Sequence, residues 1–173
     1  SIDYRIVQEP GKRVMLIEPK EKSWGPDYLR FGLGVATDFS SDSQFNLLAS
    51  YRKTWLNRLG GEWLTEVQVG KDNRLYTEFY QPIGPSQYMF VVPRVQYSVT
   101  PWYLFEDTIQ IAQYRNTQAI AALDLGANII QYGDARIGLR YGYTSFELLS
   151  GIPQFPARRN TNIGAVNAQL TLD

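Results

Sequence analysis

The sequence of 173 residues contains no cysteine and no histidine. Without cysteine there is no disulfide framework and no thiolate ligand for a metal ion. Without histidine the chain lacks the commonest general base and the commonest metal ligand. Ser-His-Asp triads, Cys-His pairs and zinc sites of this kind are therefore excluded within the chain. We expect no catalytic residue, no metal site and no cofactor here.

The chain also lacks extremes of charge and hydrophobicity. Its 17 lysines and arginines balance 17 aspartates and glutamates, so the formal net charge is zero. Without a basic excess, no nucleic-acid partner is expected. No run of eighteen apolar residues is present, so no transmembrane helix is predicted. No secretory signal peptide is visible, which for an exported protein implies a mature chain or a piece of one.

Aromatic residues, by contrast, are abundant. They make up 14% of the chain, with 12 tyrosines, 8 phenylalanines and 4 tryptophans. Tyrosine and tryptophan are enriched where a protein meets the interface between lipid and water. Soluble β-sandwiches can also be rich in tyrosine, so composition leaves a membrane protein and a soluble β protein open.

Alternation of apolar and polar residues with period two predicts an all-β chain. Turns rich in Gly, Pro, Asn and Asp separate the alternating segments. Residues 2–7 and 13–17 form two short predicted strands, so we assign residues 1–22 to the end of a small domain and residues 23–173 to a larger β structure. Eight further strands are predicted at residues 27–39, 44–56, 61–71, 74–83, 87–105, 109–131, 134–150 and 158–173.

The length and polarity of these strands favour an antiparallel up-and-down transmembrane β-barrel. A membrane-spanning strand needs about 9–11 residues, whereas strands of soluble proteins average about 5–6. In a barrel the apolar face meets lipid and the polar face lines the lumen, although a soluble sandwich alternates too. The charged residues on the predicted lumen face would form a charged channel, a docking surface or a solvated wall of paired charges. These lumen-facing candidates are Glu62, Glu66, Glu78, Arg94, Asp124, Arg136 and Arg140.

Aromatic residues gather near the predicted strand ends, as expected of girdles at two membrane interfaces. The alternative is that they form ordinary cross-strand pairs. One end of the predicted sheet carries Trp55, Trp63, Tyr88 and Tyr132. The other carries Phe39, Phe45, Tyr76, Phe105, Tyr143 and Phe146. Of these we predict that lipid-interface positions are held by Trp55, Trp63, Tyr88, Tyr132, Phe105 and Tyr143.

Three segments resemble the patatin-like phospholipase autotransporters of type V secretion. The segment EPKEKSWGPDYLRFGL at residues 18–33 is similar to the junction between a polypeptide-transport-associated domain and the first barrel strand of that family. YRKTWLNRLGGEW at residues 51–63 is similar to its second strand, periplasmic turn and third strand. LDLG, YG and RIGLRYG, within residues 123–142, look like its sixth and seventh strands.

The resemblance covers nearly the whole chain and implies a fused architecture. Members of the family carry a phospholipase domain, one polypeptide-transport-associated domain and a 16-stranded barrel of the outer-membrane assembly and two-partner transporter superfamily. Residues 1–22 would then end the periplasmic domain, and residues 23–173 would supply about eight strands, half of the barrel. The Gly-x-Ser-x-Gly motif of the enzyme domain is missing, and so is the superfamily's Arg-Gly-Phe/Tyr signature. The sequence also stops without the terminal aromatic that such barrels carry, which indicates a truncated barrel.

The expected function is that of an anchor or translocation domain in the bacterial outer membrane, which holds or exports a fused lipase domain and is not itself an enzyme. The expected partners are outer-membrane lipid, the outer-membrane assembly machinery, and either the remaining barrel strands or a second copy. Two alternatives remain open. One is the barrel of an outer-membrane assembly factor or two-partner transporter, and the other is a soluble β-sandwich binding module.

Overall fold

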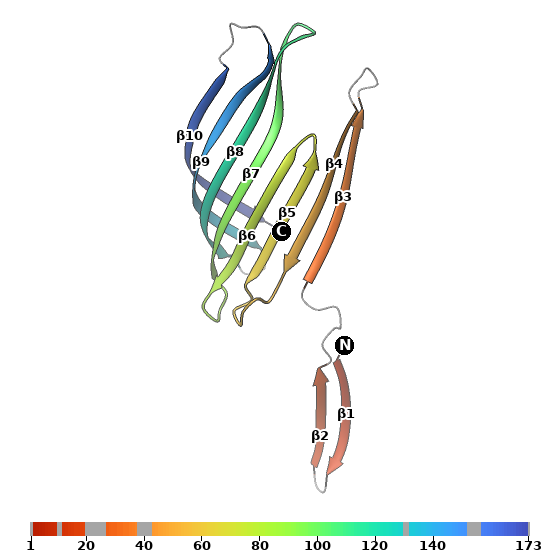
Figure 1. Ribbon diagram of the computed structural model, residues 1–173. Coiled ribbons are helices and arrows are strands. Elements are labelled where there is room, and N and C mark those ends of the chain that lie inside the picture. Colours follow the sequence, from red (N-terminus) through yellow and green to blue (C-terminus); the bar gives the residue numbers. More distant parts are fainter. Residues whose placement is uncertain are drawn as a thin grey trace.

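The computed structural model describes residues 2–9, 12–19, 27–37, 43–129, 132–151 and 157–172. Every element in these ranges is a β-strand (Figure 1). The strands are β1 (Ile2–Glu9), β2 (Lys12–Pro19), β3 (Asp27–Thr37), β4 (Ser43–Lys53), β5 (Glu62–Gly70), β6 (Asn73–Ile83), β7 (Met89–Glu106), β8 (Ile109–Asn128), β9 (Gly133–Gly151) and β10 (Arg158–Leu172).

The strands β3 to β10 form one antiparallel sheet in which each strand pairs with its neighbours in the sequence. Strands β1 and β2 pair with each other in a separate two-stranded sheet. Among the described strands, nothing pairs with the outer edge of β3 or of β10, so the large sheet is open. The prediction of an all-β chain with eight antiparallel up-and-down strands is thus confirmed.

Strand boundaries lie within three residues of the predicted ones. The largest differences are at β4, which ends at Lys53, and at β8, which ends at Asn128. The end of β4 has a local cause, because Trp55 adopts a φ of 55° and Asn57 caps the turn. The side-chain oxygen of Asn57 accepts hydrogen bonds from the backbone N–H groups of Leu59, at 3.0 Å, and Gly61, at 3.1 Å.

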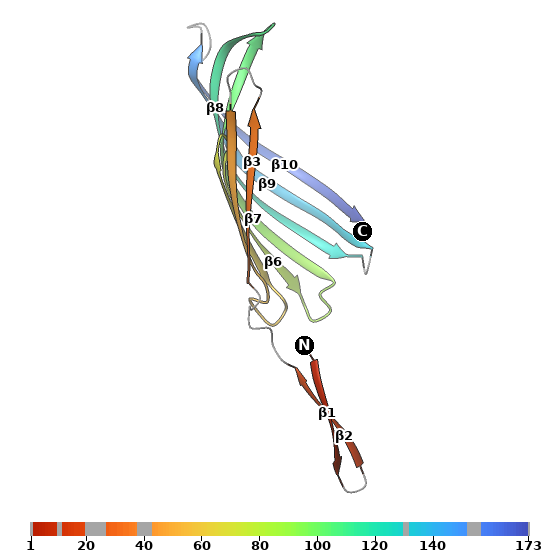
Figure 2. The ribbon, with the colours of Figure 1, turned by 90° about the vertical axis from the view of Figure 1, so that its right-hand side faces the viewer.

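The turns divide the sheet into two ends, which we call lower and upper as drawn in Figure 1. The β4–β5, β6–β7 and β8–β9 turns lie at the lower end, and the β5–β6 and β7–β8 turns lie at the upper end. A view from the side shows that the sheet curves into a trough (Figure 2). No helix long and apolar enough to cross a membrane occurs in the described part of the chain.

The sheet has little conventional core. The buried apolar side chains are Phe90, Val92, Ala112 and Tyr114, which alternate along β7 and β8 and so share one face. The register of the other strands places Asp124 and Thr144, also buried, on this same face. Because contacts between side chains concentrate there, this is the concave face of the trough. Large apolar residues on the opposite, convex face are exposed.

Candidate functional site

The convex face is covered by exposed apolar side chains. Side chains on a strand alternate between faces, and the pairing registers extend that alternation across all eight strands. The exposed aliphatic and phenylalanine residues of this face include Leu29, Phe31, Leu33, Val35, Phe45, Leu47, Val67, Val69, Leu75, Val95, Leu123, Leu125, Ile137, Leu139, Val166, Leu170 and Leu172. Such a continuous apolar surface on a sheet marks a site of interaction with lipid or protein.

This apolar band has a defined upper boundary. On β8 and β9 it covers residues 119–127 and 135–143, and the two stretches lie side by side because Ala119 pairs with Tyr143 and Ala127 with Ala135. Each stretch has the length of about 9–11 residues that a membrane-spanning strand needs. Above it, beyond the pair of Thr117 and Ser145, Arg115 and Glu147 are opposite each other on the convex face and form an ion pair of 3.6 Å.

The concave face carries the charges. All seven lumen-facing candidates predicted from the sequence lie on it, as the pairing registers show. Ion pairs connect Arg52 with Glu62 (3.2 Å), Arg74 with Glu66 (3.0 Å), Arg94 with Asp124 (3.0 Å) and Arg136 with Asp134. Glu78 accepts a hydrogen bond from the Tyr76 hydroxyl, and Arg140 is exposed. Most of the predicted charges are thus paired along the wall of the trough.

Four partners of these charges were not predicted from the sequence: Arg52, Arg74, Asp134 and Tyr76. For three of them the residue numbers already indicated the face. Arg74 and Tyr76 are even-numbered like Glu78 on β6, and Asp134 is even-numbered like Arg136 on β9. Residues of equal parity on one strand share a face. Which residues meet across strands depends on the registers, which sequence alone did not provide.

The structure places the six predicted interface aromatics at exposed positions, five of them near strand ends. Trp55, Tyr88 and Tyr132 lie in lower turns, and Trp63 lies on the convex face at the lower end of β5. Phe105 lies near the β7–β8 turn, and Tyr143 lies at the upper limit of the apolar band. Whether these six meet lipid stays a prediction.

Two other aromatics that were predicted at the second end of the sheet do not lie on its outer face. Tyr76 and Phe146 project from the concave face, so their assignment to an outer girdle was wrong. Parity was again the missed signal, since Tyr76 shares it with Glu78 and Phe146 shares it with Arg140. Phe45 is exposed on the convex face, and Phe39 lies outside the described residues.

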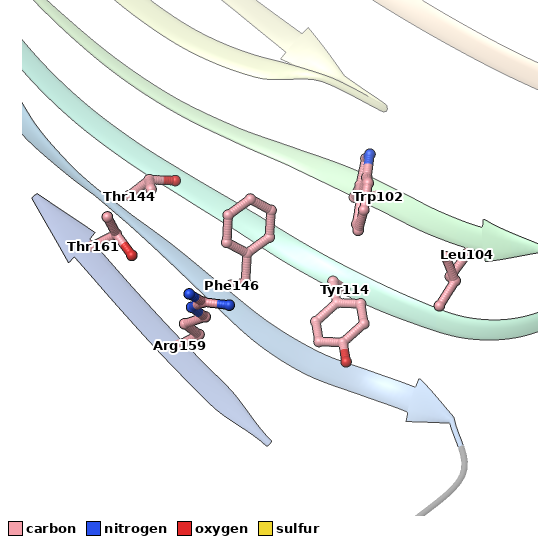
Figure 3. A pocket seen from close by; sticks show the side chains of 7 residues that line it. All are labelled: Trp102, Leu104, Tyr114, Thr144, Phe146, Arg159 and Thr161. Carbon is pink, nitrogen blue, oxygen red and sulfur yellow. The ribbon is translucent and has the colours of Figure 1, made fainter. Parts of the chain in front are cut away.

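Phe146 belongs to an aromatic hollow on the concave face, near the upper end of the sheet (Figure 3). The hollow has a volume of about 490 Å³ and is mostly apolar. Its rings come from three different strands, with centroid distances of 5.9 Å between Trp102 and Phe146 and 6.4 Å between Trp102 and Tyr114. The lining side chains are Trp102, Leu104, Tyr114, Thr144, Phe146, Arg159 and Thr161. This hollow was not predicted from the sequence.

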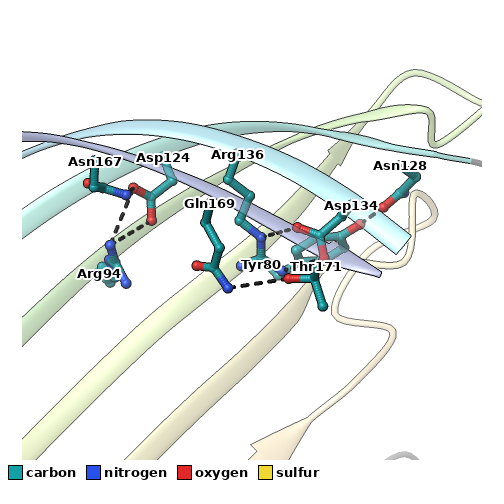
Figure 4. Close-up of polar contacts among 9 residues, drawn as sticks. All are labelled: Tyr80, Arg94, Asp124, Asn128, Asp134, Arg136, Asn167, Gln169 and Thr171. Carbon is teal, nitrogen blue, oxygen red and sulfur yellow. Dashed lines mark hydrogen bonds and ion pairs between the residues drawn. The ribbon is translucent and has the colours of Figure 1, made fainter. Parts of the chain in front are cut away.

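Below the hollow, a polar network connects four strands (Figure 4). The Asp124 carboxylate on β8 is 2% exposed, pairs with Arg94 on β7 and accepts a hydrogen bond of 3.3 Å from Asn167 on β10. The strand between Asp124 and Asn167 contributes Gly138, which is in register with both residues. A Cβ atom at Gly138 would lie 1.8 Å from the Asp124 carboxylate. Only glycine therefore lets this side chain cross β9 and reach β10.

One cross-strand pair lower on the concave face, a second side chain also crosses a glycine of the neighbouring strand. The Phe90 ring lies over Gly126, its partner across β7 and β8, where a Cβ atom would be 2.2 Å from the ring. The ring thereby reaches the Arg136 guanidinium on β9, 5.1 Å from its centroid. Tyr80 also contacts the Phe90 ring, with centroids 4.8 Å apart. In both cases a side chain spans a glycine on the neighbouring strand, which holds strands two apart together on the concave side.

A polar hollow of about 350 Å³ adjoins these contacts of Phe90 and includes Arg52, Glu62, Glu78 and Arg136 in its lining. Its charges are of both signs, and three of the four are in the ion pairs given above. In the described part of the chain, no group of three or more carboxylates is placed to hold a metal ion. These side chains provide a hydrogen-bonded wall in which two positive charges and two negative charges balance.

Comparison with known proteins gave no matching family model, no similar curated protein and no similar solved structure.

Proposed function

We propose that β3–β10 form part of the wall of a transmembrane β-barrel in the bacterial outer membrane, with the convex face toward lipid and the concave face toward the lumen. The observation that carries this proposal is the distribution of polarity over the two faces. Leu139 on the convex face is 65% exposed, whereas the ion-paired Asp124 on the concave face is 2% exposed. An outer-membrane barrel has this pattern, with an apolar outer band and a polar interior.

The open edges of the sheet imply partner strands. Backbone groups left unpaired in hydrocarbon cost several kcal/mol each, so β3 and β10 cannot both face lipid without a neighbour. Because the sheet has eight strands, β3 and β10 run in opposite directions, and an antiparallel junction between such edges is possible. We infer that further strands of a 16-stranded barrel, or a second copy of the chain, complete the wall.

The finer proposal is an anchor or translocation domain of a patatin-like autotransporter. It is supported by the resemblance of residues 18–33, 51–63 and 123–142 to that family and by a short hairpin, β1–β2, that precedes the first strand of the sheet. The barrel of an assembly factor or two-partner transporter would have the same wall. A soluble β-sandwich is disfavoured, because its apolar side chains would lie between two sheets. Here, among the described strands, only β1 and β2 lie outside the large sheet.

Single nitroxide labels at two neighbouring positions test the membrane assignment. The chain has no native cysteine, so Leu139→Cys and Arg140→Cys each provide a unique attachment site. In lipid vesicles we expect the label at 139 to be relaxed by oxygen and shielded from a water-soluble nickel chelate, and the label at 140 to show the reverse. Equal accessibility of the two labels to both reagents would overturn the proposal.

The anchoring role needs a separate measurement. A folded reporter protein fused ahead of Ser1 should remain with lipid vesicles after an alkaline wash, because the strands that follow would be embedded. A control fusion that ends at Pro19, and so lacks β3–β10, should be released. Release of the complete fusion by the same wash would contradict an anchor while leaving the open sheet unchanged.

A further inference from the structure

The long strands β7–β10 continue above the apolar band, and there the concave face changes character. Within the band this face carries paired charges, such as Arg94 with Asp124 and Arg136 with Asp134, beside the exposed Arg140. Above it, the face is formed by the aromatic hollow. Strand β6 does not extend to this level, because its first residue, Asn73, pairs with Val99, and β7 runs on to Glu106. Strand β6 therefore does not cover the hollow on its Trp102 side.

The side chains of the hollow form a stepped apolar surface. Trp102 pairs directly with Tyr114 across β7 and β8, and Phe146 pairs directly with Arg159 across β9 and β10. Tyr114 is buried and provides the floor, whereas Trp102 is 53% exposed and stands at the side (Figure 3). A large indole beside a buried ring presents an apolar recess for the side chain of another molecule.

Arg159 is the one charged residue in this lining, and it is exposed. The other arginines named on the concave face, apart from Arg140, each have a carboxylate partner, as the pair of Arg94 and Asp124 illustrates. Within the described residues, no carboxylate lies within ion-pair distance of Arg159. The hydroxyl of Thr144 donates to Asn116 at 2.8 Å, so the polar side of the hollow offers an incoming group chiefly the guanidinium.

We propose that the aromatic hollow docks an extended polypeptide segment that presents an aromatic or branched apolar side chain next to a carboxylate. The apolar side chain would enter between Trp102 and Tyr114, and the carboxylate would pair with Arg159. Trp, Tyr and Arg are the residue types that dominate the energetics of protein–protein contacts. An arginine fork also binds carboxylates with two parallel hydrogen bonds. The proposal does not depend on whether the convex face meets lipid.

The test uses the full chain in phosphatidylcholine nanodiscs and a fluorescein-labelled peptide, Gly-Phe-Asp-Leu-Gly-amide, followed by fluorescence anisotropy. We expect saturable binding, weakened at least about tenfold by Trp102→Ala, as for a central aromatic anchor. Arg159→Gln should weaken binding of this peptide but leave unchanged the weaker binding of a Gly-Phe-Asn-Leu-Gly peptide. That difference isolates the contact between guanidinium and carboxylate and does not arise from a general loss of folding.

Two matched controls separate the hollow from the rest of the surface. Trp63→Ala removes a tryptophan of similar exposure from the convex face, and Arg158→Gln removes the neighbouring positive charge from the opposite face of β10. Neither should change peptide affinity. The proposal is overturned if the acidic peptide does not bind, or if both controls weaken its binding as much as the hollow variants. It is also overturned if unlabelled laurate displaces the labelled peptide at a lower concentration than the unlabelled peptide does. A water-soluble chain would contradict the membrane proposal alone, and the same titration would then be run in buffer.

Discussion

The sheet consists of two halves that differ in length. Strands β4, β5 and β6 have 11, 9 and 11 residues, and β3 also has 11, whereas β7, β8, β9 and β10 have 18, 20, 19 and 15. The short half has the length of a membrane crossing, about 9–11 residues. The long half exceeds it by several residues on each strand, so a membrane crossing alone does not account for its length.

The polarity of the long half changes where its extra length begins. On the convex face the apolar rows end and give way to the ion pair of Arg115 and Glu147. On the concave face the paired charges give way to the aromatic hollow around Trp102. The extension therefore carries both charged and apolar side chains on its outer face, such as Glu147 and Leu149, and an aromatic hollow on its inner face. We propose that lipid contacts the convex face of the short half. We propose further that water contacts the convex face of the extension and that a ligand binds its concave face.

The largest expected effect is a cross-link between the two open edges of the sheet, β3 in the short half and β10 in the long half. Cysteines at Gly34 on β3 and Gln169 on β10, both on the concave face, should form a disulfide between two copies and double the apparent mass in a denaturing gel. The physical reason is that unpaired edges in hydrocarbon must find partner strands. We measure the fraction of covalent dimer after mild oxidation in vesicles.

The control for this cross-link moves one cysteine to the other face. Leu33→Cys combined with Gln169→Cys places the two thiols on opposite faces of any common sheet, so its yield should be low. Efficient bonding of positions 34 and 169 within a monomer would show that the two halves close on each other. That result would disprove the need for a second copy or further strands.

The next effect tests whether lipid shapes the band and not the extension. Leu139→Arg, in the middle of the band on β9, should lower the free energy of unfolding by roughly 2–4 kcal/mol, the cost of a cation at the bilayer midplane. Leu149, on the same strand above Glu147, shares a hollow with the convex-face residues Tyr103 and Arg115. Leu149→Arg should therefore cost about 0–1 kcal/mol, as near an interface. Urea unfolding in vesicles measures both variants. Equal costs would remove the proposed boundary between band and extension.

Much of this fold could be predicted from the sequence, for reasons visible in single strands. The alternation in residues 135–143 and the turns rich in Gly and Asn define the strands and their number, because each is a local pattern. Nearest-neighbour pairing then follows from short turns. The open curvature of the sheet did not follow, since it depends on contacts such as that of Phe90 with Arg136 across Gly126, which join residues far apart in the chain.

The candidate site was predicted in part. Parity alone was enough to place Glu62, Asp124 and Arg136 on one face, and the structure agrees. The close approach at Gly138, which the Asp124 carboxylate of the neighbouring strand covers, does not follow from the sequence alone. The aromatic hollow was missed because Trp102 and Tyr114 become neighbours only through the β7–β8 register.

A smaller effect is expected from the glycine beneath the polar network of the long half. Gly138→Ala would place a Cβ atom 1.8 Å from Asp124 and 3.0 Å from the Leu123 carbonyl oxygen. The carboxylate must then move away from Asn167, and we expect a loss of about 1–3 kcal/mol, as for a buried polar group that loses its partner. Gly164→Ala on β10 is the control, since its Cβ would meet nothing within 4 Å and should be neutral or stabilise slightly. Unfolding midpoints of the two variants in the same vesicles provide the comparison.

The smallest effect should come from the ion pair that marks the end of the band. Arg115 and Glu147 are 50% and 54% exposed and 3.6 Å apart, so solvent screens their attraction. A double-mutant cycle with Arg115→Ala and Glu147→Ala should show a coupling of about 0.2–1 kcal/mol that decreases as salt is added. The same cycle on Arg94 and Asp124, where the carboxylate side chain is 3% exposed, should show a larger coupling that salt changes less. If the two cycles gave equal values with equal salt dependence, water would reach both faces alike, and the distinction between band and extension would lose its electrostatic basis.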